Sequence, residues 1–226
     1  MSDFFNQDMA KRYDERNSKL SPISENLHFL VRLVLADLPS QARVLCVGVG
    51  TGAEILSLAK AHPAWTFVGV DPSQEMLDVC RSRLAQEGAG DRCELIHGYV
   101  QDVPEGTAFD AVLSILVAHF IARAERGDFY RSILKRLKPE GYFVSAEISA
   151  DLKALEFPAM LKNWEQVQKL MGATPDSLLK LEDTLRTALA VVSPVDTVEL
   201  WRESGFAAPT EFFQAFMIRG WYARAP

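Results

Sequence analysis

The stretch "VLCVGVGTG", residues 44–52, decides how this chain folds. Its apolar first half has the character of a buried strand, and glycine then takes three alternate positions, Gly48, Gly50 and Gly52. A helical pattern, "AEILSLAKAH", follows directly. Glycine tolerates the backbone angles of a tight turn and lets a ligand approach the main chain closely. The stretch therefore predicts a ligand-binding turn between a strand and a helix.

Strand and helix patterns alternate on both sides of this turn. Helical spacing covers residues 24–38 and stops at Pro39. Strands are expected at 43–49, 66–71, 93–100, 109–116 and 142–149, with helices at 53–61, 73–86 and 126–137 between them. Almost wholly apolar strands that alternate with helices indicate a parallel sheet covered on both faces. The predicted fold class is α/β, with a doubly wound, mostly parallel sheet.

The alternation stops at Ala150. From there to Ser193 the sequence has only helical periodicity, and after Pro194 a helix leads into two strand-like segments. We expect a single domain over residues 1–226. Its parts would be an N-terminal helical lid at 1–40, a cofactor-binding core at 41–149, a helical cap inserted at 150–193, and a final helix and strand pair at 194–226.

The bulk composition favours a small-molecule enzyme. The formal net charge is −6 and no cluster of four basic residues occurs, so nucleic-acid binding is not expected. The first residues, "MSDFFNQDMAKRYDERN", lack the apolar core of a signal peptide, and no apolar run approaches the ~20 residues of a membrane span. Three cysteines without ligand-like spacing predict no metal site. We expect a cytoplasmic protein without membrane contact.

Two carboxylates follow the next two strands. Asp71 ends the second strand about twenty residues after the glycines, where an acid can accept hydrogen bonds from both hydroxyls of an adenosine ribose. NAD and S-adenosylmethionine both carry that ribose. Asp102, followed by Val103, stands after the third strand, where an acid and an apolar residue suit the amino edge and ring of an adenine. Three such features at consecutive strand ends indicate an adenosine site.

These features resemble the class I S-adenosylmethionine-dependent methyltransferase family. The resemblance runs from the glycine turn through Asp71 and Asp102 to "FDAVLSILVAHF" and "LKRLKPEGYFVSAE", and covers residues 42–149. It implies a seven-stranded, Rossmann-like methyltransferase fold and S-adenosyl-L-methionine as the cofactor. One departure is Cys46, which stands where the family usually has an acid that helps to hold the ammonium group of the donor.

The resemblance also implies roles for single residues. Gly48, Gly50 and Gly52 would line the methionine part of the donor, and Asp71 would hold the ribose. The residues that would surround the adenine are Pro72, Met76, Asp102, Val103, Ser114 and Ile115. Upstream, "AKRYDER" is similar to a segment that folds over the donor in small-molecule members, which would place Tyr13 above the sulfonium.

Methyl transfer requires a base only where the acceptor must lose a proton. His119, in "LVAHF" after the fourth strand, is one candidate for this catalytic role. Glu147, at the end of the fifth strand, is the other. His119 would lie at the rim of the expected pocket, and Glu147 would act as a base or orient the acceptor.

Several alternatives remain at this stage. The C-terminal part, with "LWRESGF" and "FQAFMIRGWYARA", is similar to the carboxy-S-adenosylmethionine synthase family. That family holds an extra carboxylate with an arginine on a cap helix; here Glu182 aligns with that position and Arg186 lies one turn later, which favours the ordinary methyl donor. An NAD-dependent reductase and a non-catalytic adenosyl-ligand-binding protein are further candidates. The sequence leaves the acceptor and the oligomeric state open, with a homodimer as one candidate.

Overall fold

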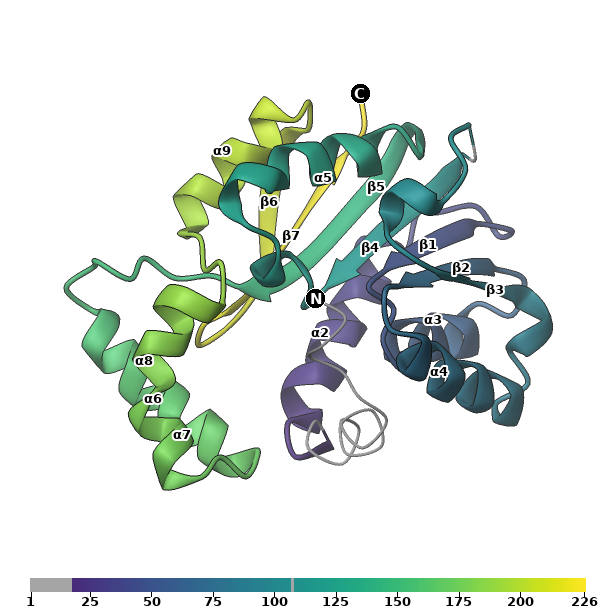
Figure 1. Ribbon diagram of the computed structural model, residues 1–226. Helices are drawn as coiled ribbons and strands as arrows, with labels where there is room; N and C mark the ends of the chain where they lie inside the picture. The colour runs from purple at the N-terminus through teal and green to yellow at the C-terminus, as the bar shows by residue number, and fades with distance from the viewer. Residues whose placement is uncertain (1–17, 107) are drawn as a thin grey trace.

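The computed structural model of the chain describes residues 18–106 and 108–226. Within them seven strands form one sheet, in the order β3-β2-β1-β4-β5-β7-β6 (Figure 1). Their bounds are β1 Arg43–Val47, β2 Thr66–Asp71, β3 Cys93–His97, β4 Phe109–Ile115, β5 Leu137–Ile148, β6 Ala207–Ala215 and β7 Ile218–Arg224. The first five strands pair in parallel, whereas β7 runs antiparallel to both β5 and β6. The predicted seven-stranded, mostly parallel sheet is confirmed.

The strand order reverses at β1, which lies between β2 and β4 in the sheet. The chain passes from β1 outward to β2 and β3, and then returns to place β4 on the other side of β1. Ligands of doubly wound sheets bind outside the carboxyl ends of the strands where the order reverses. The parallel pairing of Val47 with Val70 brings the glycine turn next to Asp71. The turn and the acid therefore meet at that reversal point.

Helices α2 (Ser21–Val34), α3 (Ala53–Ala61) and α4 (Gln74–Gln86) cover one face of the sheet. Leu27 and Val31 of α2 pack in the same buried cluster as Ile55 of α3 and Leu77 of α4. The Ser73 hydroxyl accepts a hydrogen bond from the backbone N–H of Met76, so Ser73 caps α4, as the sequence predicts. These three helices surround the glycine turn.

Helices α5 (Arg126–Leu134) and α9 (Pro194–Glu203) cover the other face. Their aromatic side chains stack on the sheet: the Trp201 and Phe143 rings lie 4.3 Å apart between centroids, and the Tyr130 ring is 5.8 Å from that of Trp201. Short 3-10 turns connect the elements at Gly90–Arg92, Val100–Asp102, Ala118–Phe120 and Arg123–Glu125. The sequence predicted α5 to continue to residue 137, but Leu137 already pairs with Phe109 in the sheet.

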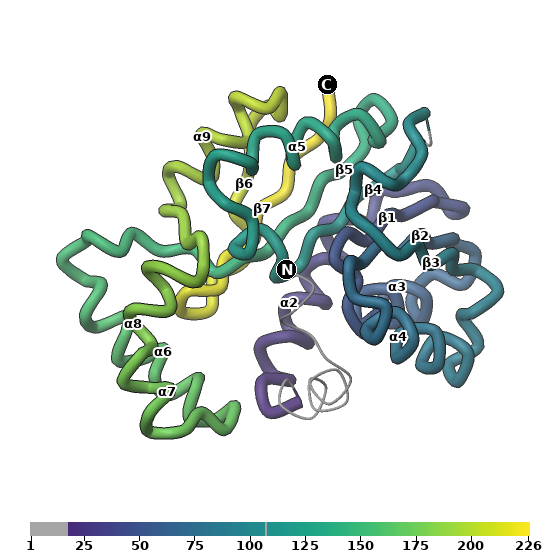
Figure 2. The backbone as a smooth tube through the Cα atoms, in the orientation of Figure 1, coloured from purple at the N-terminus to yellow at the C-terminus, as the bar shows by residue number. Residues whose placement is uncertain are grey.

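The segment from 150 to 193 is helical, as its periodicity predicts. It contains α6 (Phe157–Leu170), α7 (Pro175–Leu179), α8 (Leu181–Asp183) and a turn of π-helix at Thr184–Ala188. These helices form a projection at one end of the molecule (Figures 1 and 2). Phe157, Trp164 and Leu185 tie the projection to the core that α2 and α3 share. We call residues 150–193 the cap.

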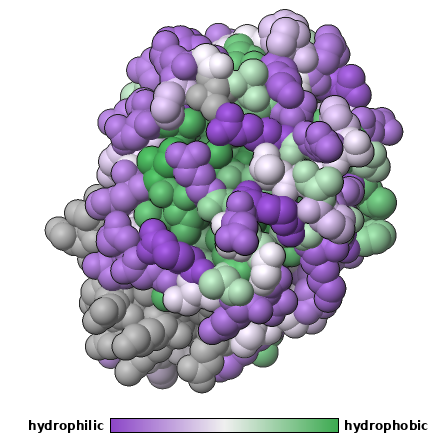
Figure 3. All heavy atoms as spheres, turned by 90° about the vertical axis from the view of Figure 1, so that its right-hand side faces the viewer, coloured by the Kyte–Doolittle hydropathy of each residue, from purple (hydrophilic) through white to green (hydrophobic). Residues whose placement is uncertain are grey.

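Among the described residues no helix has both the length and the apolar character that a bilayer crossing requires. Figure 3 views the side on which β3 and α4 lie in Figure 1. Hydrophilic side chains cover most of this face, and hydrophobic ones gather near its middle. β3 is the edge strand here, and its residues are partly exposed, which is ordinary for a sheet edge that meets solvent.

Candidate functional site

The glycine turn is held against β2 by its own backbone. The N–H groups of Gly48 and Val49 both donate to the carbonyl oxygen of Val70, at 2.8 and 3.1 Å. The N–H of Gly50 also points to β2 and donates to the Asp71 carboxylate at 2.8 Å. The turn and the acid thus form one unit, so displacement of either would move the other.

Glycine is required at the three positions of the turn for different physical reasons. All three have positive φ angles, +67° at Gly48, +52° at Gly50 and +84° at Gly52. A Cβ atom at Gly48 would overlap the Val117 side chain, and one at Gly52 would lie 2.6 Å from the Cys80 sulfur. A Cβ at Gly50 would meet no heavy atom within 4 Å. Gly48 and Gly52 therefore permit internal packing, whereas Gly50 keeps backbone open beside free space.

Asp71 is nearly enclosed, with 8% of its surface exposed. One carboxylate oxygen accepts from Gly50 N–H and the other from Ser73 N–H at 2.9 Å. Burial raises the pKa of this carboxyl, and the two backbone N–H groups act in the opposite direction. An ionised carboxylate offers about four acceptor positions, so two backbone bonds leave capacity for a ligand diol.

A cavity of about 400 Å³ opens beside the turn. Its lining comes from five parts of the chain that meet at the carboxyl ends of the strands. The described lining residues are Ser18, Leu20, Ile23, Ser24, Leu27, His28, Gly48, Val49, Gly50, Thr51, Ala53, Glu54, Arg83, Ile115, Leu116 and Ile218. Helix α2 supplies much of one wall, and none of the described lining residues belongs to the cap.

Leu116 marks the end of β4 with a strained backbone. Its φ angle is +59°, in the left-handed region that a branched side chain rarely adopts, while its N–H donates to Ala146 O at 2.6 Å. Such strain concentrates at functional sites, because neighbouring structure has to maintain it. Together with Ile115, Leu116 forms the wall of the cavity on the β4 side.

The structure brings together only some of the residues that the resemblance singled out. Gly48, Gly50 and Ile115 line the cavity, and Asp71 bonds to Gly50 behind it. Met76 and Val103 are buried, with 3% and 1% of their surface exposed. Tyr13 lies outside the described residues.

Val103 and Ser114 are buried inside the fold. Val103 packs with Val100 and Phe109 in the cluster under α5 and α9. Ser114 is fully enclosed in β4, and its carbonyl accepts from the Ser145 hydroxyl at 3.0 Å. Neither side chain is among the described residues that line the cavity.

Asp102 and Pro72 stand at the solvent edge next to Asp71. The Asp102 carboxylate is exposed and accepts from Tyr99 N–H at 2.7 Å. The Pro72 carbonyl lies 3.0 Å from the His97 ring nitrogen Nε2. An adenine that reached this edge would find an exposed carboxylate and a partly buried proline, which is compatible with the predicted roles.

Three ionisable side chains in the cavity wall were not singled out from the sequence: His28, Glu54 and Arg83. Burial, and the Arg32 charge behind it, lower the pKa of His28 to about 4, so its ring is neutral at pH 7. Burial raises the pKa of the Glu54 carboxyl to about 7. The Arg83 guanidinium donates to the carbonyl and hydroxyl oxygens of Thr51, at 3.0 and 2.9 Å. The "GTGAE" context alone gives no signal that Glu54 faces a cavity.

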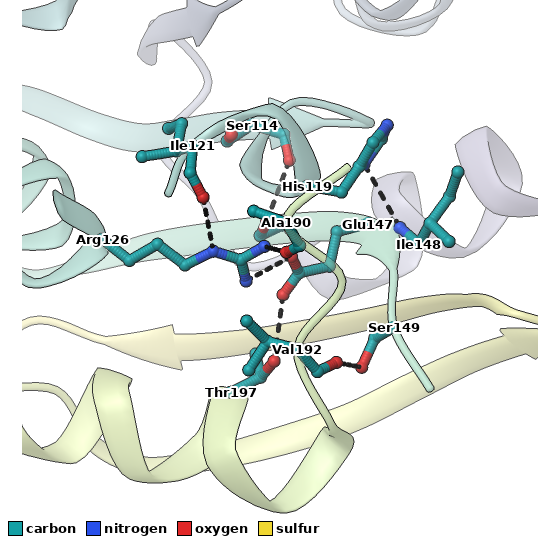
Figure 4. A network of polar contacts seen from close by, with 11 residues as sticks. Ser114, His119, Ile121, Arg126, Glu147, Ile148, Ser149, Ala190, Val192 and Thr197 are labelled. Atoms are coloured by element: carbon teal, nitrogen blue, oxygen red, sulfur yellow. Dashed lines mark hydrogen bonds and ion pairs between the residues drawn. The ribbon is translucent and has the colours of Figure 1, made fainter. Parts of the chain in front are cut away.

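His119 lies inside the fold (Figure 4). It is 3% exposed, and its Nδ1 accepts a hydrogen bond from Ile148 N–H at 3.3 Å, which assigns the proton to Nε2. Burial, followed by the Arg126 charge, lowers the pKa of the ring to about 3. His119 does not line the cavity, and the ring positions the end of β5, a role that a base at the pocket rim would not have.

The Glu147 carboxylate also bonds to other parts of the fold. Its carboxylate accepts from Arg126 at 2.6 Å and from the Thr197 hydroxyl at 3.1 Å, with both charged side chains almost completely buried (Figure 4). Arg126 also donates to the carbonyls of Ala190 and Ile121. This network joins β5, α5, α9 and the end of the cap. Glu147 does not line the cavity, so the geometry gives it a structural role.

The two cap residues weighed for a carboxylated donor, Glu182 and Arg186, are not among the described residues that line the cavity. Arg186 pairs with Glu182 at 2.9 Å and donates to Leu152 O at 3.0 Å. Its guanidinium also lies 5.1 Å from the centre of the Phe157 ring. Both residues line a separate shallow depression on the cap.

The comparisons with known proteins agree with this geometry. Residues 44–141 match the family described as "Methyltransferase domain". The chain is 25% identical to the carboxy-S-adenosyl-L-methionine synthase of Methylococcus capsulatus over 97% of this chain and 93% of the relative. Two solved structures share the fold: an O-methyltransferase family protein from Burkholderia thailandensis, with TM-score 0.69 and 15% identity, and PigF with SAH, with TM-score 0.68 and 19% identity.

These two structures cover 95% and 96% of this chain, which itself spans 59% of each of them. The prediction of S-adenosylmethionine as the cofactor is confirmed at the level of the family. The resemblance stated from the sequence is confirmed as well: residues 44–141 match the methyltransferase-domain family, and the described chain shares its fold with solved methyltransferase structures.

Proposed function

We propose that this protein is an S-adenosylmethionine-dependent methyltransferase that acts on a small molecule. The observation that carries the proposal is the cavity between the glycine turn and α2. It lies at the reversal point of the sheet, its size suits a small ligand, and Gly50 leaves open backbone at its wall. An acidic chain whose sequence has no cluster of four basic residues suits a small acceptor better than a nucleic acid.

In this proposal the adenosine part of the donor lies outside the cavity proper, over Asp71. The carboxylate would accept from the ribose hydroxyls, while Pro72, Met76 and Asp102 would lie around the adenine. The methionine part would extend past Gly50 into the cavity. This orientation follows from the order of the groups along the edge of the sheet, with Asp102 after β3, Asp71 after β2 and the turn after β1.

The reaction is an in-line displacement at the sulfonium methyl group. The acceptor forms a bond to the methyl carbon, the carbon–sulfur bond breaks, and its electron pair stays on the sulfur of S-adenosylhomocysteine. Most of the rate enhancement in such a reaction comes from holding the two reactants in line and close together. The apolar walls from Leu27, Ile115 and Leu116 would exclude water from the reacting groups.

The experiment that tests this function starts from the protein as purified. Mass spectrometry of the co-purifying small molecule identifies the donor. Incubation with methyl-labelled donor and fractionated metabolite pools then identifies an acceptor by transfer of the label. Binding of S-adenosylhomocysteine without label transfer to any pool would instead support a non-catalytic adenosyl-ligand-binding protein.

A second candidate is a carboxy-S-adenosylmethionine synthase-like enzyme. The full-length similarity to the Methylococcus capsulatus protein favours it. The bonding of Arg186 to Glu182 and Leu152 favours the methyl donor, because an extra buried carboxylate needs a cation. Competition between S-adenosylhomocysteine and its carboxymethyl sulfonium analogue decides between them. A preference for the carboxylated ligand that is lost in Arg186→Ala would establish the synthase.

The setting of the enzyme is part of the same proposal. We propose that it works in the cytoplasm on a soluble small molecule, with residues 1–40 as a lid and the cap as an accessory element. A homodimer stays a prediction. Light scattering with and without S-adenosylhomocysteine measures the oligomeric state directly.

A further inference from the structure

Among the described residues of the cavity wall, one carboxylic acid has no ion-pair partner. Glu54 stands in the first turn of α3, directly after the glycine turn, and its side chain lines the cavity. Within residues 18–106 and 108–226 no cationic side chain forms an ion pair with it. An enclosed carboxylate without a cation is costly unless a ligand supplies the charge.

The described surroundings of Glu54 favour its ionised form only in part. Burial acts most strongly on its carboxyl and opposes ionisation, the residue's own backbone N–H and the Arg83 charge on α4 favour ionisation, and the Asp71 charge on β2 opposes it. Burial raises the pKa of the Cys46 thiol on β1 and of the Cys80 thiol on α4, and the Glu54 charge adds to both shifts. Both thiols therefore stay neutral. His28 of α2 is neutral as well. Arg83 donates to Thr51, and the carboxylate remains available to the cavity.

From this geometry we infer that Glu54 is the residue that binds the ammonium group of the donor's amino-acid part. The inference rests on the proposed function and names a residue for the same site. Glu54 is two residues beyond Gly52 and lines the cavity along with Gly50 and Thr51, on the side toward which the methionine part would extend. A carboxylate and an ammonium group form short, charge-assisted hydrogen bonds in such an enclosed setting.

The position of Cys46 agrees with this assignment. Cys46 is 2% exposed in β1, and its neutral thiol offers no charge to a cation. Burial raises the pKa of this thiol most, and the Glu54 charge raises it further. The acid that is absent at Cys46 is therefore matched by an acid in the first turn of the following helix, α3.

The test compares two ligands that differ in the ammonium-bearing part. S-adenosylhomocysteine carries the amino-acid group, whereas 5′-methylthioadenosine shares the adenosine and sulfur but lacks it. We expect Glu54→Gln to weaken S-adenosylhomocysteine binding at least about tenfold and to leave 5′-methylthioadenosine within about twofold in titration calorimetry. Glu25→Gln is the matched control, because Glu25 is exposed on α2 beside the cavity without lining it. It should leave both ligands unchanged.

A second measurement needs no variant. Because the Glu54 carboxyl is partly protonated near pH 7, an arriving ammonium group should drive it to the ionised form. Calorimetry in buffers of different ionisation enthalpy should therefore detect proton release with S-adenosylhomocysteine but not with 5′-methylthioadenosine.

A third measurement uses a double variant. In Cys46→Asp/Glu54→Gln, the new acid should recover part of the affinity for S-adenosylhomocysteine that Glu54→Gln loses.

The outcomes separate the inference from the proposed function. Equal weakening of both ligands by Glu54→Gln, or equal proton release with both, would overturn the inference and make Glu54 a structural acid. Unchanged binding of S-adenosylhomocysteine to Glu54→Gln would do the same. Absence of S-adenosylhomocysteine binding to the unmodified protein would instead overturn the proposed function itself.

Discussion

Glu54 and Glu147 are two carboxylates at the same edge of one sheet, and their surroundings differ. Glu147 at the end of β5 has an arginine and a threonine as partners, and it joins three elements of the fold. Glu54 after β1 faces a cavity and forms no ion pair with the described residues. Burial raises the pKa of both carboxyls. A raised pKa at a strand end therefore does not identify a functional acid; the presence or absence of internal partners does.

The largest expected effect comes from breaking the Glu147 network. Glu147→Ala leaves the Arg126 guanidinium buried without its carboxylate, which costs about 3–5 kcal/mol of unfolding free energy. Urea unfolding measures this loss. The fraction that stays folded should bind S-adenosylhomocysteine with an affinity within about twofold of the original. A tenfold loss of affinity at unchanged stability would show that Glu147 belongs to the binding site.

Asp71→Ala should mainly weaken ligand binding, whereas Glu147→Ala should mainly lower stability. It removes charge-assisted hydrogen bonds worth about 1.5–3 kcal/mol each, so S-adenosylhomocysteine should bind at least about tenfold less tightly. Asp110→Ala is the matched control. Asp110 is also buried and accepts a backbone N–H, from Arg43 at 2.8 Å, but it lies at the start of β4, on the opposite edge of the sheet. Equal affinity losses in the two variants would remove the ribose role of Asp71.

Glu54 predicts a pH dependence of stability. Its pKa is raised from 4.5 to about 7 by burial, so between these values the folded protein holds a proton that the unfolded chain has released. The unfolding free energy should therefore fall as the pH rises from about 4.5 to about 7, relative to Glu54→Gln, by up to about 3 kcal/mol, and less because the side chain is partly exposed. Parallel pH profiles of the two proteins would contradict the raised pKa of this acid.

The glycines of the turn predict the smallest effects, and they separate packing from binding. Gly48→Ala forces a side chain against Val117 and should destabilise the fold by about 1–3 kcal/mol. Gly50→Ala costs about 1–2 kcal/mol for its positive φ, meets no protein atom, and should additionally weaken S-adenosylhomocysteine binding. Unfolding and titration calorimetry of both variants check this. Equal ligand affinity in the two variants would contradict the assignment of Gly50 to the open wall.

Much of the fold was predictable because its signals are local. The helix at Ala53–Ala61 and the strand at Thr66–Asp71 have the predicted bounds, and Ser73 caps α4 as expected. The boundaries that differ depend on long-range pairing. The helix predicted to reach residue 137 ends at Leu134, because pairing with Phe109 places Leu137 in β5.

The candidate site was less predictable for the same reason. The glycines and Asp71 follow a strand-end rule that a sequence displays, and the structure brings them together. Whether a side chain faces a cavity depends on packing between distant segments, so His28 and Glu54 gave no signal. His119 and Glu147 occupy strand-end positions suited to catalysis, but their hydrogen-bond partners, Ile148, Arg126 and Thr197, became visible only with the tertiary structure.

The central claim is that the glycine turn and Asp71 form the site of an adenosyl-sulfur cofactor. Titration calorimetry with S-adenosylhomocysteine and with NAD tests it most directly, because both ligands carry the adenosine ribose. The account predicts that S-adenosylhomocysteine binds and that NAD binds at least about a hundredfold less tightly, a difference of ~2.8 kcal/mol. NAD binding as tight as that of S-adenosylhomocysteine, or tighter, would contradict it.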